Sequence, residues 1–549
     1  MPAAPRPLVS PDTKGAPLAM PFDKETIHRR RWWTLVALCL SLVLVIVGNT
    51  VLNVALPTLV RELNATNSEL QWMVDSYALV FAGLLLTAGA LGDRFGRKLA
   101  LNGGLAVFGL GAVAAAVSSN PGQIVAARAV MGVGAAFVMP ATLSILAAVF
   151  PPEERPKAIA IWAGLSGAGA AIGPVAGGWL LEHFWWGSVF LLNVPIVVIA
   201  LVAGRFLVPS SKDPQETPLD PIGAALSIVG VGALVYGIIE APVEGWTSAR
   251  PITGFVVAVA GLVAFGLWEH RTRHPMLDLA FFRRHAFSAG AGAITLVFFA
   301  MFGSFFLLTQ FFQLVLGYTP FEAGVRLLPV ALTLMLVAPN SARLAERIGT
   351  RNTMAIGLTV VAAGLGLYTV AGPDASYAVV LLPVVVMAMG MGLTIPPATS
   401  AIMSSLPLAK AGVGSAVNDT TRELGGALGV AVLGSIVASA YAAKLSDAVP
   451  PQMPAQALEV AKSSLGAALE VARQAGAPEL AGIARTAFVE AMHIANVVAA
   501  GIALVAAAVV LRFMPSTVEP HPHGGQTPMD DEAGARAMAT AAEVESFVP

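Results

Sequence analysis

Residues 169–178 read Gly-Ala-Ala-Ile-Gly-Pro-Val-Ala-Gly-Gly and lie inside the fifth long apolar run of the chain. Gly169, Gly173 and Gly177 are four residues apart, so on a helix they share one face, which carries no side chains. A neighbouring helix can approach such a face closely, while Pro174 removes a backbone donor and favours a kink. The stretch therefore predicts a flat, bent membrane helix, suited to packing between two halves of a moving membrane protein.

Composition places most of the chain in a bilayer. Its 549 residues are 56% hydrophobic and 12% charged, whereas a soluble domain carries about 25% charged residues. Cys39 is the single cysteine, so no disulfide can form within the chain, and a net charge of −1 argues against a nucleic-acid partner. Arg29, Arg30 and Arg31 precede an apolar stretch too long for a signal-peptide core, so we expect the first span to stay in the membrane.

Fourteen apolar runs come close to the ~20 residues that a membrane-spanning helix needs. An even number places both termini on one side, and the bias of Lys and Arg toward alternate loops indicates that this side is cytoplasmic. We therefore expect an all-α, multi-pass protein of a bacterial plasma membrane. The runs are 33–56, 72–92, 99–118, 122–149, 158–181, 189–208, 222–240, 252–268, 288–315, 324–344, 353–372, 377–403, 414–440 and 487–512.

An internal repeat divides the chain. The second run closes with Gly89-Ala-Leu-Gly-Asp93-Arg94-Phe-Gly96-Arg97-Lys98, and the tenth closes with Ala342-Arg-Leu-Ala-Glu346-Arg347-Ile-Gly349-Thr-Arg351. Both have a small residue, an acid, Arg, Gly and a base at the same spacing. Because parallel repeats are a known transporter architecture, we expect a six-helix half over 29–210, two inserted helices with a cytoplasmic linker over 211–285, and a second six-helix half over 286–514.

Three further segments are not expected to cross the membrane. Residues 1–28 and 515–549 are predicted to be disordered cytoplasmic tails. Segment 443–485 is predicted to lie outside the cell, either as an amphipathic helix over the outer mouth or as a mobile loop. In favour of the helix, Leu458, Leu465 and Leu469 share one helical face, and two oppositely charged pairs, Glu459/Lys462 and Glu470/Arg473, are spaced i,i+3.

The loop at Gly89–Lys98 is a candidate conformational element. Gly89 lets a neighbouring helix come close, and Asp93 at the membrane edge can accept from the N-terminus of that helix. Arg94, Arg97 and Lys98 hold the loop in the cytoplasm, which an ordinary positively charged loop would also do.

Arg128 and Asp75 are candidate proton-coupling residues. Arg128 lies roughly seven residues into the fourth run, about 10 Å deep, where an arginine is costly unless it faces protein or water; the alternative is that it reaches the outer headgroups. Asp75 lies at a similar depth in Trp72-Met-Val-Asp75-Ser-Tyr77. We expect Asp75 to be protonatable and to communicate with Arg128 directly or through water, unless it is an interfacial aspartate in bulk water.

A second acid lies at the start of the thirteenth run, which contains Asn418-Asp419-Thr-Thr-Arg422-Glu423. Asp419 is a further proton-site candidate. Alternatively, Asp419 and Arg422 simply neutralise each other at i,i+3 spacing.

Taken in order, these motifs resemble those of the major facilitator superfamily, in its fourteen-helix drug:proton antiporter branch. The resemblance rests on Gly89–Lys98, on Arg128-Ala-Val-Met-Gly132, on Gly169–Gly178 as the antiporter motif, and on Phe190-Leu-Leu-Asn193-Val-Pro195. It implies a secondary transporter that uses the proton gradient and alternating access to export amphipathic or cationic drugs. A dedicated exporter of one endogenous product would share every motif, and a non-transporting receptor or scaffold is a remote alternative.

The substrate cavity is expected between the halves near the membrane midplane. Aromatic rings there could stack on planar drugs or hold cations, although each ring could equally face lipid or a neighbouring helix. Asn49 and Asn53, one turn apart, are polar groups in hydrocarbon and are expected to line the cavity or bridge helices. The other predicted lining residues are Trp72, Tyr77, Phe298, Phe302, Gln310 and Gln313.

Two positions depart from the pattern of the branch. Gly48 stands where relatives usually carry Asp in the first run, and an apolar run around Leu334 stands where some carry an acid. Two carboxylates that could bind a cation or a proton are thus missing, which bears on the export of dicationic drugs and on proton stoichiometry. The sequence shows no nucleophile triad, metal-ligand cluster or ATP site, so we expect a monomeric transporter in the lipid bilayer, with protons and small amphipathic substrates as partners, no cofactor and no enzyme activity.

Overall fold

The computed structural model describes residues 24–151, 154–210, 220–272, 275, 279–405, 411–450 and 453–516. All regular elements among these residues are helical, which confirms the predicted all-α class. The α-helices are α1 (Lys24–Leu63), α2 (Asn67–Phe95), α3 (Arg97–Ala116), α4 (Pro121–Val149), α5 (Arg155–His183), α6 (Ser188–Leu191), α7 (Asn193–Leu207), α8 (Pro221–Glu244), α9 (Ala249–Arg271), α10 (His285–Gln310), α11 (Pro320–Arg326), α12 (Leu328–Ile348), α13 (Thr350–Leu367), α14 (Tyr377–Ser404), α15 (Ala411–Ala448), α16 (Ala455–Ser463), α17 (Leu465–Gln474) and α18 (Pro478–Phe513). Three short elements, η1 (Leu279–Arg283), η2 (Phe311–Val315) and η3 (Tyr368–Val370), complete the set.

Within this described part, 12 helical segments are long and apolar enough to cross a membrane, so the chain is a multi-pass membrane protein. The predicted number of fourteen spans is not confirmed, since this count of the described residues leaves out α2 and α5. Both helices are nevertheless 29 residues long and pack inside the bundle, α2 against α4 and α5 against α1.

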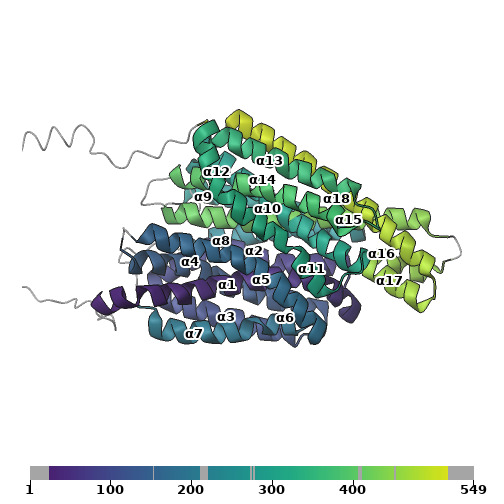
Figure 1. Cartoon of the computed structure of the whole chain (residues 1–549), viewed down its shortest axis with the longest axis horizontal. Helices are drawn as coiled ribbons and strands as arrows, with labels where there is room; N and C mark the ends of the chain where they lie inside the picture. The colour runs from purple at the N-terminus through teal and green to yellow at the C-terminus, as the bar shows by residue number, and fades with distance from the viewer. Residues whose placement is uncertain are drawn as a thin grey trace, which may run out of the picture.

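The helices form two groups with an inserted pair between them in sequence. Helices α1 to α7 pack mainly on one another, and so do α10 and α12 to α18, although α15 also contacts α2. Helix α11 packs mainly on α5, while α8 pairs with α9 and also contacts α2 and α15. Helix α1 begins and α18 ends at one end of the bundle, and α16 and α17 lie at the other (Figure 1). We name these the terminal end and the hairpin end. The domain boundaries and the cytoplasmic location of the terminal end remain predictions.

The internal repeat appears in the backbone. Gly96 joins α2 to α3 with φ 123°, and Gly349 joins α12 to α13 with φ 88°. Each glycine N–H donates to the carbonyl four residues earlier, at 2.9 Å. Positive φ angles favour glycine, so the same residue makes the same sharp turn at matching places in the two groups.

Segment 443–485 forms two short helices rather than one. The backbone of Ser464 is extended, and its side chain caps α17 by accepting from the Ala467 N–H at 3.1 Å. Both predicted pairs form, Glu459 with Lys462 at 2.9 Å and Glu470 with Arg473 at 2.6 Å. The sequence shows the helical periodicity of this segment, but the break at Ser464 interrupts it.

Candidate functional site

Arg128 is fully buried and joins three helices. Its Nε donates to the Met73 carbonyl of α2 at 3.0 Å, and its Nη1 donates to the Gly48 carbonyl of α1 at 2.8 Å. The guanidinium lies 4.4 Å from the ring centre of Tyr77. Gly132, one turn further along α4, permits this approach, because a Cβ there would lie 2.7 Å from the Tyr77 carbonyl. The guanidinium is therefore held inside protein rather than at the headgroups.

Gly48 stands where the family resemblance predicts an aspartate, and its backbone carbonyl accepts from Arg128. A Cβ at Gly48 would lie 2.6 Å from the Phe108 ring and 3.4 Å from Oδ1 of Asn193. That Asn193 oxygen is buried without a hydrogen-bond partner among the described residues. An aspartate here would therefore point toward α3 and α7, and it would need Phe108 to move.

Asp75 is also fully buried, and neither of its carboxylate oxygens has a hydrogen-bond partner in the described part of the chain. Arg128 instead contacts Met73 and Tyr77, which are each two residues away. Side chains two residues apart on a helix point about 160° apart, so Asp75 leaves α2 from a different face. Its neighbour one turn away, Gln71, faces Gly434 of α15. The direct form of the predicted Asp75–Arg128 contact is absent here, and a connection through water stays a prediction.

Glu423 of α15 is the residue that sequence reasoning missed. This half-buried carboxylate interacts electrostatically with Arg128 and Tyr77, which belong to the other group of helices. It also interacts with Asp419 and Arg422 on its own helix. Its i,i+4 spacing from Asp419 in an apolar run is a visible signal, but only the packing of α15 shows which helix it faces.

Asp419 lies in a cluster on α10, α14 and α15. Arg422 contacts it at 3.6 Å, and the Asn418 amide donates to it at 3.4 Å. Arg422 also lies 4.9 Å from the ring centre of Phe298, which stacks on Phe302 with centroids 6.1 Å apart. The ion pair between Asp419 and Arg422 that the i,i+3 spacing allowed is therefore formed. The guanidinium of Arg422 also lies against the Phe298 ring of the stacked pair, where a cationic substrate was expected to bind. A proton-binding role for Asp419 stays a prediction.

The predicted cavity residues lie at several places. Asn49 and Asn53 of α1 are buried, and Oδ1 of Asn53 has no partner among the described residues. Gln310 donates to the Phe306 carbonyl of its own helix at 3.1 Å. Gln313 donates across the two groups to the Val54 carbonyl at 2.8 Å. It lies in η2, a π-helical turn of a kind often found at functional sites.

Trp72 and Tyr77, both of α2, face different partners. The Trp72 indole donates to Glu240 of α8 at 3.1 Å, and Ser68 donates to the same carboxylate at 3.0 Å. Tyr77 lies under Arg128. The structure therefore turns Trp72 toward the inserted helices, and the substrate-binding roles of both residues stay predictions.

The glycine face of α5 packs on α1. A Cβ at Gly169 would lie 3.3 Å from Ile46, one at Gly177 would lie 2.5 Å from Val51, and one at Gly173 would collide with Thr50. This face was predicted to pack between the two halves, but α1 belongs to the same group of helices. Successive residues of a helix point about 100° apart. The positions of α5 that contact the other group therefore lie on a different face from Gly169, Gly173 and Gly177.

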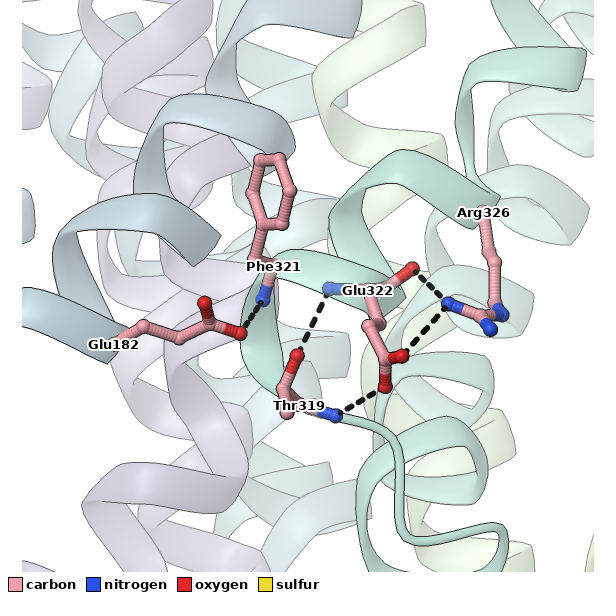
Figure 2. Close-up of polar contacts among 5 residues, drawn as sticks. All are labelled: Glu182, Thr319, Phe321, Glu322 and Arg326. Atoms are coloured by element: carbon pink, nitrogen blue, oxygen red, sulfur yellow. Dashed lines mark hydrogen bonds and ion pairs between the residues drawn. The ribbon is translucent and has the colours of Figure 1, made fainter.

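Those contacts join α5 to α11 at the hairpin end. A Cβ at Gly178 would lie 2.6 Å from Cα of Phe321, and the Pro174 carbonyl abuts Gly324. The Glu182 carboxylate accepts from the Phe321 N–H at 3.2 Å (Figure 2).

Helix α11 is itself braced at its start. Thr319 and Glu322 form a capping box, and Arg326 lies 3.9 Å from the Glu322 carboxylate (Figure 2). Glu182 thus holds a preformed helix start rather than a loop.

The loop at Gly89–Lys98 packs against two neighbouring helices at the terminal end. A Cβ at Gly89 would lie 3.4 Å from Pro140 of α4, and Arg97 donates to the Ser144 carbonyl of α4 at 3.5 Å. Lys98 donates to the carbonyls of Arg205 and Val208, at 2.9 and 2.7 Å, at the C-terminal end of α7. Arg94 is exposed, and the side chain of Asp93 lies outside the described part of the chain.

The described residues contain no cluster of three His, Cys, Asp or Glu side chains arranged to hold a metal ion. The centre of the described part holds charged groups that are buried or half-buried: one arginine from α4 and acids from α2 and α15.

Comparisons with known proteins identify what the chain is similar to. Residues 38–430 match the family model described as Major Facilitator Superfamily. The chain is 36% identical to the multidrug efflux pump LfrA of Mycolicibacterium smegmatis, over 88% of this chain and 96% of that protein. It is 33% identical to the tetracenomycin C resistance and export protein of Streptomyces glaucescens, over 88% and 92%.

A further relative is the methyl viologen resistance protein SmvA of Salmonella typhimurium, which is 35% identical over 81% of this chain and 89% of that protein. Among solved structures, a bacterial homologue of the human lysosomal transporter Spinster superposes with a TM-score of 0.64 at 16% identity. The superposition covers 90% of this chain and 99% of that chain, and it shows a shared fold.

Proposed function

The chain belongs to the major facilitator superfamily, and we propose that it is a proton-coupled efflux transporter of amphipathic or cationic compounds. The observation that carries the proposal is the fully buried Arg128, bound to two backbone carbonyls and within electrostatic range of Glu423 from the other group of helices. The names of the relatives, which include multidrug efflux and resistance proteins, support export as the direction.

Glu423 and Arg128 supply a means of coupling. Opposite charges attract far more strongly in a low-dielectric interior than in water. An ionised Glu423 therefore draws α15 toward Arg128, and protonation removes that attraction. The charge state of one carboxylate biases how firmly the two groups of helices are held, which is what an alternating-access exchanger requires of its proton site.

Asp75 is the second proton carrier in this proposal. It is fully buried without a hydrogen-bond partner among the described residues, which favours the neutral carboxyl until water or a partner arrives. It lies on the same helix as Tyr77, so a change at the Arg128 contact is transmitted along α2.

We infer that the structure represents the state closed at the hairpin end. The contacts that join the two groups there include Gln313 with Val54, Glu182 with Phe321, and Gly178 with Pro320. The basic residues Arg94, Arg97 and Lys98 support a cytoplasmic location for the opposite, terminal end. In a bacterial plasma membrane, substrate would enter from that end.

A dedicated exporter of one endogenous product is the second candidate. One relative is named for the resistance to and export of a single compound, tetracenomycin C. The range of transported compounds distinguishes the two candidate functions, because a multidrug transporter accepts chemically unrelated cations and a dedicated exporter does not.

Transport in proteoliposomes tests the proposal. A pH gradient should drive uptake or release of several compounds in a panel of planar cations and neutral amphiphiles, and collapse of the gradient should stop it. Asp75→Asn should abolish gradient-driven transport, whereas Asp447→Asn, an exposed acid at the hairpin end, should not. Full activity of Asp75→Asn would remove Asp75 from the mechanism, and transport indifferent to the gradient would overturn proton coupling.

A further inference from the structure

A groove of about 540 Å³ runs along the surface of the bundle between α10 and α18. Its lining is apolar apart from Ser288, and it includes Gly292, Leu296, Gly501, Val505 and Val509. The two glycines open the groove, because a Cβ at either would meet nothing within 4 Å. Its volume lies in the range of about 300–1,000 Å³ typical of ligand pockets, and Val505 and Val509 are exposed on it.

The groove spans one leaflet at the terminal end of the bundle. It follows α10 over 288–296 and α18 over 498–510, which correspond to about 12 and 18 Å of helix. Half of the hydrocarbon core of a bilayer is about 15 Å. The groove thus has the depth of one lipid chain and opens toward the bilayer rather than toward Arg128.

An arginine and a histidine border the end of the groove. Arg512 lies three residues after Val509, and His285 lies three before Ser288, so each continues a face that lines the groove by one more turn. Phe513 connects the two, with its ring centre 6.2 Å from that of His285 and 5.6 Å from the Arg512 guanidinium.

The two chain segments that border this end carry basic residues and no acid. Residues 279–290 and 505–516 contain three arginines, one histidine and no acid. Arg284 donates to the Ser405 carbonyl, whereas Arg512 is exposed and no carboxylate pairs with it among the described residues. A cationic rim at the end of a one-leaflet apolar groove complements a lipid whose headgroup is an anion.

We propose that this groove binds an anionic phospholipid from the leaflet at the terminal end. One acyl chain lies along Gly292 and Gly501, and the phosphate contacts Arg512 and His285. Burial of methylene groups provides affinity for any phospholipid, and the basic residues add the selection for negative charge. The site lies on the outer surface of α10 and α18, so it is separate from the proposed proton and substrate path.

Lipid binding to the purified full-length protein tests the proposal. Native mass spectrometry would measure how many molecules of phosphatidylglycerol and of phosphatidylcholine the protein retains, both lipids having the same palmitoyl-oleoyl chains. The thermal stability of the protein would be measured as each lipid is added. The wild type should retain phosphatidylglycerol in preference. The double variant Arg512→Gln/His285→Gln should lose that preference, with about a fivefold loss of affinity from removal of the Arg512 charge.

Matched variants keep the result interpretable. Gly501→Leu should fill the groove and weaken both lipids, whereas Gly266→Leu, on α9 with equally open surroundings, should not. Arg343→Gln removes an exposed arginine from α12 and should leave the preference intact. Equal retention of the two lipids by the wild type, or equal effects of the two leucine variants, would overturn the site. A lipid-free dimer abolished by Gly501→Leu would instead assign the groove to a second copy of the chain.

Discussion

Arg128 illustrates at the scale of one residue how a charge is accommodated inside a membrane. Moving an arginine into hydrocarbon is costly, and a buried charge needs hydrogen bonds and a counter-charge. The Met73 and Gly48 carbonyls supply the hydrogen bonds, and Nη2 has no partner among the described residues. Glu423 supplies negative charge from the opposite group of helices, so a proton on Glu423 changes the balance at Arg128.

Glu423→Gln is the test that belongs to this scale. Glutamine keeps the size of the side chain and removes its charge, so we expect at least a tenfold loss of gradient-driven efflux with folding unchanged. Exchange of labelled for unlabelled substrate without a gradient should persist, because it does not require a net proton movement.

The control is Glu470→Gln, which removes a partly exposed acid paired with Arg473 on α17. This variant should transport normally. If Glu423→Gln were as active as Glu470→Gln across the pH range, Glu423 would have no part in coupling.

Gly48 shows why a missing carboxylate at this position is not simply a lost ligand. Its carbonyl binds Arg128, and the direction of its absent Cβ leads to Phe108 and Asn193. The side chains around this position pack closely against a glycine, so it contributes a backbone oxygen where the family resemblance predicts an acid.

At the scale of an element, α5 uses two sets of small residues for two partners. Gly169, Gly173 and Gly177 bring it against α1, while Gly178 and Pro174 bring it against α11. The first contact lies within one group of helices and persists if that group moves as a unit. The second contact crosses between the groups and must separate when the hairpin end opens.

Two leucine substitutions on α5 should therefore have different effects, one on stability and the other on transport. Gly173→Leu forces a side chain against Thr50, and overpacking of this sort typically costs about 1–3 kcal/mol, so the protein should be less thermostable with and without substrate. Gly178→Leu obstructs closure at the hairpin end, so we expect normal thermostability, loss of transport, and greater accessibility of hairpin-end residues to water-soluble labels.

The readouts are a thermal-unfolding curve of the purified protein and the labelling rate of a cysteine placed at Phe321. Identical stability losses in the two variants would mean that the contacts of α5 with α1 and with α11 are not functionally distinct.

At the scale of the whole molecule, the contacts across the groups gather at the hairpin end. Beyond the α5–α11 contact, a Cβ at Gly466 of α17 would press on Val60 of α1. On the other side of the bundle, α8 contacts both groups, since Glu240 accepts from Ser68 of α2 and the Ile238 carbonyl accepts from Ser435 of α15 at 2.7 Å. Opening at this end requires these contacts to yield together.

A reversible crosslink tests this. The chain has a single cysteine, Cys39, so Cys39→Ala provides a cysteine-free background. With Glu182→Cys and Phe321→Cys, a short bifunctional thiol reagent should lock the hairpin end and reduce transport at least tenfold, and a reductant should restore it.

A pair within one group serves as the comparison. Lys444 and Glu490 form an ion pair at 2.5 Å between α15 and α18, and a crosslink between cysteines at these positions should leave transport unchanged. Full transport by the crosslinked Glu182/Phe321 pair would show that this contact does not open during the cycle.

The sequence by itself determined that the molecule is an all-α membrane protein. It also identified the charged residues, glycines and prolines that interrupt its hydrophobic helices. The all-α membrane fold follows from the length of the apolar runs and from the repeat around Gly96 and Gly349, because these are local properties of helix and turn. The family was identified from the resemblance of several sequence motifs. Pairs such as Asp419 with Arg422 were visible for the same reason, since i,i+3 spacing fixes neighbours on one helix.

Only the tertiary structure decided which helices those residues face. It turned Gly173 toward α1, placed Glu423 near Arg128, separated Asp75 from the guanidinium and set Trp72 against Glu240. Helical periodicity states that residues share a face, but the partner of that face depends on how every helix in the bundle packs at once, which spacing along one chain does not encode.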